Sequence, residues 1–173
     1  AGLASPELLA ESWPDLDLED AAEPPAETLI ERARAAEGAA MAVPGIVNSE
    51  GGGAGFSRYG VALATSEGFY GRYAGTSHSV GVAVLAGADD GMERDYDYAT
   101  ARHGADLESP EAVGRRAGER TVKRLHPRRV KSQAAPVVFA PRVAASLLGH
   151  LIGAISGAAI ARGVSFLKDS LGE

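Results

Sequence analysis

Apolar residues recur three and four positions apart in two stretches of the chain, and both stretches are predicted to be amphipathic helices. The first runs from about residue 26 to residue 43, and Pro44-Gly45 ends it. Its apolar side consists of Leu29, Ile30, Ala33, Ala36, Ala40 and Met41. Before it, Ser5-Pro6-Glu7 predicts a short helix, and the acidic, proline-bearing residues 15–25 predict an extended linker.

The second amphipathic helix is predicted to begin at Ser109-Pro110-Glu111 and to end near Leu125, before His126-Pro127. Its inward residues are Val113, Ala117, Thr121, Val122 and Leu125. The other side of the helix and the residues after it are basic up to Lys131. They form a candidate contact surface of Arg115, Arg116, Arg120, Lys123, Arg124, Arg128 and Arg129.

Residues 46–102 favour strands. We predict strands at residues 56–65, 69–75, 79–85 and 92–102, with turns at 66–68 and 87–91. Such short turns allow only antiparallel neighbours, so the strands are expected to form a meander. In the last strand Tyr96 and Tyr98 share one face and Asp95 and Asp97 the other. The glycine-rich residues 51–55 are expected to be a flexible loop, because they lack the Lys-Ser/Thr of a phosphate-binding loop.

The end of the chain is strongly apolar. A short strand is predicted at Pro136 to Phe139, followed by a helix whose apolar part lies between Arg142 and Arg162. Small residues recur every four positions along one face of this helix, and such a face allows another backbone to approach closely. They are Ala145, Gly149, Gly153, Gly157 and Ala161. We expect a buried helix, because Ala and Gly dominate and make a membrane span the weaker alternative.

These elements predict an α+β fold: an antiparallel β-meander flanked by helices, then a strand and a buried Gly/Ala-rich helix. Three parts are expected. Residues 1–25 form the N-terminal helix and acidic linker, residues 26–131 a middle α+β domain, and residues 132–173 the start of a C-terminal domain.

The charge is unevenly distributed. Residues 1–50 carry a net charge of −9, residues 51–110 carry −4 and residues 111–173 carry +7. This asymmetry indicates either a charged partner or acidic and basic parts that face each other. Cysteine is absent, which excludes disulfides and thiolate metal sites and fits a cytoplasmic protein, as does the lack of a predicted secretory signal.

Several spaced motifs resemble the TldD/PmbA family, on its PmbA (TldE) side. They include IVNSEG, DYDYATAR, DLESPEAVGRRAGERTVKRL, PVVFAP, LLGHLIGAISG and SFLKDSLG, in the family's order and over nearly the whole chain. In the TldD half of the family a zinc motif, HExxxH, stands where this chain has GHLIGA. Carried over by position, its ligands and its Glu fall on Gly149, His150 and Ala154, so the resemblance implies no zinc and no catalytic residue on this chain.

The resemblance further implies a TldD-type partner that carries the zinc, and an unstructured peptide as substrate, handled in an enclosed cavity. The family is also named for modulation of DNA gyrase, which we interpret as an indirect effect of peptide processing. Two alternatives remain. One is a non-enzymatic protein that self-associates as a homo-oligomer. The other is weak contact of residues 115–131 with nucleic acid or gyrase, which the acidic chain and the absence of interleaved aromatics disfavour.

The histidines carry no recognisable ligand spacing. His150 is expected to be a buried, hydrogen-bonded residue. His78 and His103 stand near acids, but no short spacing joins them into a metal site, and we expect His78 to lie on a surface strand. Ser77 and Ser79 flank His78, yet adjacency in sequence does not orient a base on a nucleophile.

Overall fold

The computed structural model describes residues 5–88, 91–170 and 172. It divides into two compact units, residues 1–128 and residues 129–173, which are described separately. The first unit contains the short 3₁₀ helices η1 (Pro6–Leu8) and η2 (Gly104–Asp106), the helices α1 (Ala26–Met41) and α2 (Pro110–Lys123), and the strands β1 (Ile46–Ala64), β2 (Tyr70–Ala88) and β3 (Gly91–Ala101). The second unit contains α3 (Pro141–Ala154) and α4 (Gly157–Ala161).

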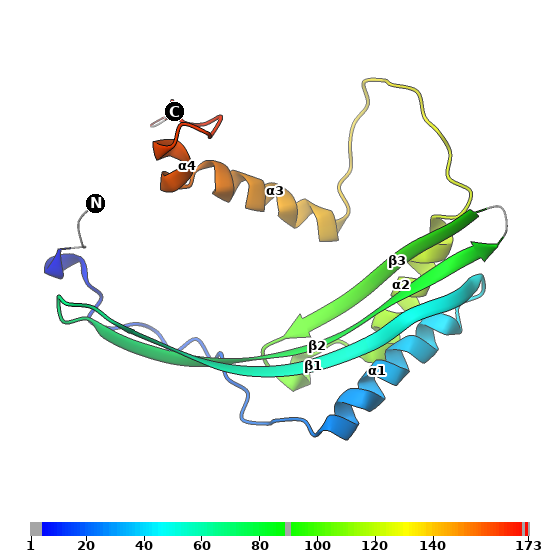
Figure 1. Cartoon of the computed structure of the whole chain (residues 1–173), viewed down its shortest axis with the longest axis horizontal. Helices are drawn as coiled ribbons and strands as arrows, with labels where there is room; N and C mark the ends of the chain where they lie inside the picture. The colour runs from blue at the N-terminus through cyan, green and yellow to red at the C-terminus, as the bar shows by residue number, and fades with distance from the viewer. Residues whose placement is uncertain (1–4, 89–90, 171, 173) are drawn as a thin grey trace. The chain divides into compact units, whose positions relative to one another are not determined.

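The first unit is one antiparallel sheet with two helices on one face (Figure 1). Within the described residues the sheet has three strands in the order β1-β2-β3. Alternate residues of β2 point toward the helices, which produces the buried series Thr76, His78, Val80, Val82, Val84 and Ala86. With Ala36, Ala40, Val113 and Ala117 of the helices, the valines form the core. The predicted α+β class is therefore confirmed.

The two helices approach each other closely through small residues. A Cβ placed on Gly114 of α2 would lie 2.0 Å from the carbonyl oxygen of Ala36, and one on Gly118 would lie 2.7 Å from Cγ2 of Val43. Real Cβ atoms do not reach such distances, so only glycine allows α2 to lie this near α1. At the start of α2, the Ser109 side chain accepts a hydrogen bond from the Ala112 N–H and caps the helix, as its sequence predicts.

The number of strands differs from the prediction. The segments 69–75 and 79–85 belong to the single strand β2, because Thr76, Ser77 and His78 continue the pairing with β1. Residues 51–55, expected to be a loop, lie inside β1, where Gly52 faces α1 and a Cβ on it would be 2.3 Å from the Ala33 carbonyl oxygen. The turn predicted at residues 87–91 includes residues 89 and 90, which lie outside the described residues.

The second unit also differs from the prediction. No strand forms at residues 136–139, and the expected helix is divided into α3 and α4 at Ile155-Ser156. Its apolar side chains are exposed rather than buried, with Leu148 and Ile152 both 65% accessible. A Cβ on Gly149, Gly153 or Gly157 would meet nothing within 4 Å, so within this chain the small-residue face has no close neighbour. Among the described residues, no helix is long and apolar enough to span a bilayer.

Candidate functional site

A segment near the N-terminus crosses the sheet at the point where β3 ends; we call residues 13–23 the N-terminal strap. The last pair between β2 and β3 is His78 with Ala101. Beyond it, the backbone N–H of Thr76 donates to the carbonyl oxygen of Leu18 at 2.9 Å. The strap thus takes the place next to Thr76 that a longer β3 would occupy.

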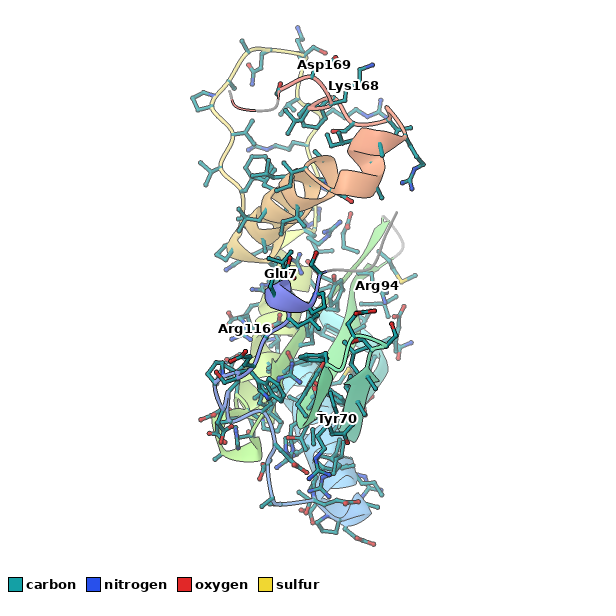
Figure 2. All side chains as sticks on the ribbon, turned by 90° about the vertical axis from the view of Figure 1, so that its left-hand side faces the viewer. Glu7, Tyr70, Arg94, Arg116, Lys168 and Asp169 are labelled. Atoms are coloured by element: carbon teal, nitrogen blue, oxygen red, sulfur yellow. The ribbon has the colours of Figure 1, made fainter. Side chains whose placement is uncertain are left out.

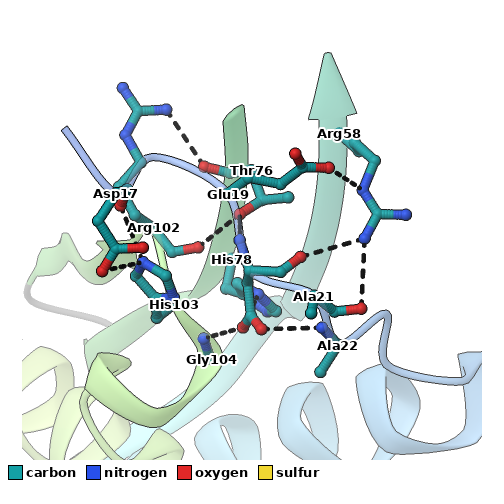
Figure 3. A network of polar contacts seen from close by, with 11 residues as sticks. Asp17, Glu19, Ala21, Ala22, Arg58, Thr76, His78, Arg102, His103 and Gly104 are labelled. Carbon is teal, nitrogen blue, oxygen red and sulfur yellow. Dashed lines mark hydrogen bonds and ion pairs between the residues drawn. The ribbon is translucent and has the colours of Figure 1, made fainter. Parts of the chain in front are cut away.

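The Thr76 side chain is the centre of the contact with the strap (Figure 3). It is fully buried, and its Oγ1 accepts from the Asp20 N–H at 2.8 Å and donates to the carbonyl oxygen of Arg102, also at 2.8 Å. One hydroxyl therefore joins the strap, β2 and the end of β3. The sequence analysis did not single out Thr76, because a lone threonine in a strand carries no signal for this role.

Asp20 holds the strap to the segment after β3. Its Oδ2 accepts the backbone N–H of Gly104 at 2.7 Å, and its Oδ1 accepts that of Ala22 at 2.9 Å. These two hydrogen bonds, the one from Gly104 first, lower the pKa of the Asp20 carboxyl below its usual 3.8. The carboxylate is therefore ionised throughout the physiological range.

Two histidines lie against this carboxylate and its neighbour. His78 is buried, contrary to the surface position expected for it, and its Nε2 lies 3.0 Å from Asp20 Oδ2. The carboxylate is poorly aligned with the ring, so neither ring nitrogen of His78 makes a hydrogen bond among the described residues. His103 Nε2 hydrogen-bonds the Asp17 carbonyl oxygen at 3.0 Å, and this bond raises the pKa of His103 above its usual 6.5.

The strap borders a groove of about 740 Å³. Its lining is mixed in character: aromatic rings, two guanidinium groups and the strap's carboxylates. The lining residues are Trp13–Glu19 of the strap together with Tyr59, Arg72, Tyr73, Ala74 and Arg102. On the opposite side of the strap, Arg58 of β1 pairs with Glu19 at 3.2 Å and donates to the Asp20 carbonyl oxygen at 3.1 Å, which fixes the strap on both sides.

The basic surface predicted on the second helix is partly neutralised within the chain. Arg116, marked in Figure 2, pairs with both Asp97 and Glu108, and Arg120 pairs with Asp97 at 2.6 Å. Arg124 pairs with Glu93 at 3.3 Å. The Arg116 hydrogen bond lowers the pKa of Glu108 and raises that of Arg116. Arg115, Lys123, Arg128 and Arg129 are exposed.

The acidic face of β3 therefore points toward α2, and its tyrosines point away. Asp95 and Asp97 are 5% and 8% accessible, whereas Tyr98 is 62% accessible. This arrangement agrees with the predicted separation of the two faces. It also resolves the alternatives for the charge asymmetry in part, since α2 and β3 bring basic and acidic side chains together.

The positions of the zinc motif do not fit a metal. Gly149 and Ala154 offer no donor side chain, and His150 is exposed on α3 rather than buried and hydrogen-bonded as expected. Within residues 5–88, 91–170 and 172, no three His, Asp or Glu side chains gather where they could hold an ion, and this includes the surroundings of His78 and His103. No catalytic step is therefore assigned to a metal on this chain.

The fold and its domain content define a class of protein. Residues 19–125 match the family model of the PmbA/TldA metallopeptidase central domain, and residues 132–173 match that of the PmbA/TldA metallopeptidase C-terminal domain. The chain belongs to the PmbA/TldA metallopeptidase family, and the resemblance seen in its motifs is confirmed.

Individual relatives agree with this assignment. The chain is 44% identical to Metalloprotease PmbA of Escherichia coli O157:H7 over all of its own length and 39% of the relative. It is 37% identical to the Metalloprotease PmbA homolog of Haemophilus influenzae, over 99% of the chain and 38% of the relative. The chain thus spans about two fifths of the length of these relatives.

Solved structures share the fold. A protein of Bacteroides thetaiotaomicron described as a modulator of DNA gyrase superposes with a TM-score of 0.89 at 26% identity, over 97% of this chain and 39% of that one. A Thermotoga maritima protein with the same description superposes with a TM-score of 0.85 at 19% identity, over 95% and 38%. The second likeness concerns the fold alone.

Proposed function

We propose that this chain is part of a PmbA (TldE)-type subunit of a zinc metallopeptidase that acts on unstructured peptides. A TldD-type sister subunit carries the zinc and the HExxxH motif, and the two form a heterodimer in the cytoplasm. The observation that carries this proposal is the 44% identity to a metalloprotease PmbA over the whole chain, combined with Gly149 and Ala154 at positions where zinc needs donor side chains.

In this role the chain contributes structure and peptide contacts rather than bond cleavage. An extended peptide is recognised most simply through main-chain hydrogen bonds to an open strand edge. The groove beside the N-terminal strap follows such an edge, and it is open to solvent on the described chain. Any effect on DNA gyrase is, in this proposal, an indirect result of peptide maturation or degradation.

The proposal is tested by measuring bound zinc and peptide cleavage on the purified protein alone and with a TldD-type sister. Alone, it should hold far less than one equivalent of zinc and should not cleave an unfolded peptide such as reduced, denatured casein. Cleavage should appear with the sister and vanish when the Glu of the sister's HExxxH is replaced by Gln. Stoichiometric zinc on the protein alone, or cleavage that survives that substitution, would contradict the proposal.

A second candidate is a self-associating protein without enzymatic activity. The observation that favours it is the exposed apolar side of α3, where Leu147, Leu151 and Ile155 are 48%, 49% and 58% accessible. Contiguous apolar side chains of this kind mark association surfaces. Light scattering separates the candidates: a homo-oligomer that persists when a TldD-type sister is added favours self-association, whereas a one-to-one pair with the sister favours the peptidase subunit.

Nucleic-acid binding by residues 115–131 receives less support. The ion pairs of Arg116, Arg120 and Arg124 with acids of the same chain reduce the charge available for phosphates. We therefore propose that this surface serves the packing of α2 on β3. Salt-dependent retention of the protein on DNA, lost in an Arg115→Ala/Lys123→Ala double variant, would contradict this.

A further inference from the structure

The strand β2 continues past the end of β3 and leaves part of its edge without a neighbouring strand. β2 pairs with β1 from Tyr70 onward, but with β3 only from His78 onward. The N-terminal strap covers the next outward position, where the Thr76 N–H donates to the Leu18 carbonyl oxygen. Between Tyr70 and Thr76 the edge therefore lacks a strand partner within the described residues.

The direction of the free backbone groups follows from the alternation of an antiparallel sheet. The N–H of Thr76 points away from β1, to Leu18, and its carbonyl oxygen accepts from Arg102 Nη1 at 3.2 Å. Residues two and four positions earlier, Ala74 and Arg72, have the same orientation. Each presents an outward N–H and C=O, and in the described chain the strap makes no backbone hydrogen bond with either residue.

These outward groups line the 740 Å³ groove, whose walls can hold side chains. Trp13, Tyr59 and Tyr73 supply aromatic surface and are 51%, 37% and 51% accessible. The guanidinium group of Arg102 is already used, since it donates to the Tyr59 hydroxyl at 2.8 Å. That of Arg72 has no ionic partner among the described residues, so it is available to a ligand carboxylate.

We propose that this groove binds an extended peptide, which adds to the sheet as a strand along Arg72 and Ala74. Main-chain hydrogen bonds to these residues hold the peptide in register. An aromatic or apolar side chain packs between Trp13 and Tyr73, and an acidic side chain or a terminal carboxylate pairs with Arg72. The strap shows the mode of binding at the neighbouring position, through Leu18 and Thr76. This inference rests on the proposed function, because it assigns the peptide a place on this subunit.

The test uses a capped, fluorescently labelled peptide of about eight residues that alternates Thr with Phe and Glu, a length that suits a typical strand. Its binding is followed by anisotropy of the label. Trp13 is the only tryptophan of the chain and lines the groove, so its emission reports binding at this place. We expect saturable binding, and a change in Trp13 emission with the same midpoint.

Two proline variants on the same hairpin provide the matched comparison. Ala74→Pro removes an N–H that points into the groove, and no hydrogen bond to β1 is lost, so binding should weaken about tenfold or more. Ala62→Pro is the control, because Ala62 pairs with Arg72 and its N–H points out of the opposite edge of the hairpin. Its affinity should stay within about twofold of the parent. Circular dichroism checks that both variants fold.

Arg72→Glu gives a second line of evidence that does not depend on proline. It should weaken the Glu-containing peptide about tenfold and should affect a Gln-containing peptide much less. No saturable binding, or binding that Ala74→Pro and Arg72→Glu leave unchanged, would overturn the inference. So would self-association that Ala74→Pro abolishes while the peptide does not bind, since a second copy would then occupy the edge.

The inference and the proposed function can fail separately. If the complex with the TldD-type sister cleaves peptides and the groove binds none, the peptidase assignment stands and the groove assignment is wrong. If the groove binds peptide and the complex never cleaves it, the binding site stands and the peptidase assignment is wrong.

Discussion

Oγ1 of Thr76 donates a hydrogen bond to the carbonyl oxygen of Arg102 at 2.8 Å, and this bond closes the sheet at the point where β3 ends. The same oxygen accepts the backbone N–H of Asp20, so the two hydrogen bonds join segments that are far apart in the sequence. A single buried side chain thus fixes the N-terminal strap beside the proposed peptide groove.

Thr76→Val should destabilise the chain by about 1–3 kcal/mol, because the isosteric side chain leaves the Asp20 N–H and the Arg102 carbonyl without their partner. Urea unfolding followed by circular dichroism measures the change. Thr100→Val is the control, since Thr100 is exposed on β3, and it should stay within about 0.5 kcal/mol of the parent. Equal effects of the two substitutions would show that the hydroxyl of Thr76 does not stabilise the strap.

Gly114→Ala should destabilise the first unit by about 1–3 kcal/mol or more, because the new methyl group would lie 2.0 Å from the Ala36 carbonyl oxygen and force α2 away from α1. Gly38→Ala is the matched control within a helix. A Cβ there meets nothing within 4 Å, so this change should stabilise α1 by about 0.5–1 kcal/mol. Thermal unfolding of the two variants should therefore shift in opposite directions.

Asp97→Ala should cost about 1–3 kcal/mol, because it removes the carboxylate that accepts from both Arg116 and Arg120. The comparison is Arg115→Ala on the exposed side of α2, which should change stability by less than about 0.5 kcal/mol. Added salt should reduce the difference between parent and Asp97→Ala if the effect is ionic. A neutral Asp97→Ala would mean that the ion pairs of α2 do not hold it on the sheet.

The pKa of His103 is raised above 6.5, chiefly by its hydrogen bond to the Asp17 carbonyl oxygen, and this predicts a pH-dependent stability. The folded chain favours protonated His103, so the contribution is complete below about pH 6.5 and disappears as pH rises through the folded-state pKa. Unfolding free energies from about pH 6 to about pH 8 should fall less steeply in His103→Gln than in the parent.

A second variant separates the two parts of Asp17 in this effect. Asp17→Asn keeps the backbone carbonyl, so NMR titration should still find the pKa of His103 raised. If Asp17→Asn returns the pKa of His103 to its usual value, the side-chain charge rather than the carbonyl is the cause.

The helices of the first unit were predictable because each has a local signal. Ser109 caps α2, Pro44-Gly45 follows α1, and Val113, Ala117 and Thr121 lie inward as their spacing predicts. The unbroken β2 was not predictable. The polar residues Thr76 to His78 interrupt its apolar pattern, and their partners Leu18, Asp20 and Arg102 are distant in the sequence.

Close packing through small residues was placed in the wrong helix. The regular spacing of Gly149, Gly153 and Gly157 attracted the prediction, yet it is Gly114 and Gly118 that touch a neighbouring helix. Spacing shows that a face is small, but it does not show which partner lies on that face. The buried position of His78 was missed for the same reason, since Asp20 and Gly104 come to it only through the fold.

The two carboxylates that β3 turns toward α2 have a consequence for how the first unit assembles. Valine and alanine side chains would tolerate a helix displaced by one turn along the sheet. Asp95 and Asp97 would not, because each would then be buried against apolar atoms without a guanidinium group. Charge therefore acts as an alignment key, and the correct docking of this helix is selected by what its misplacement would leave unneutralised.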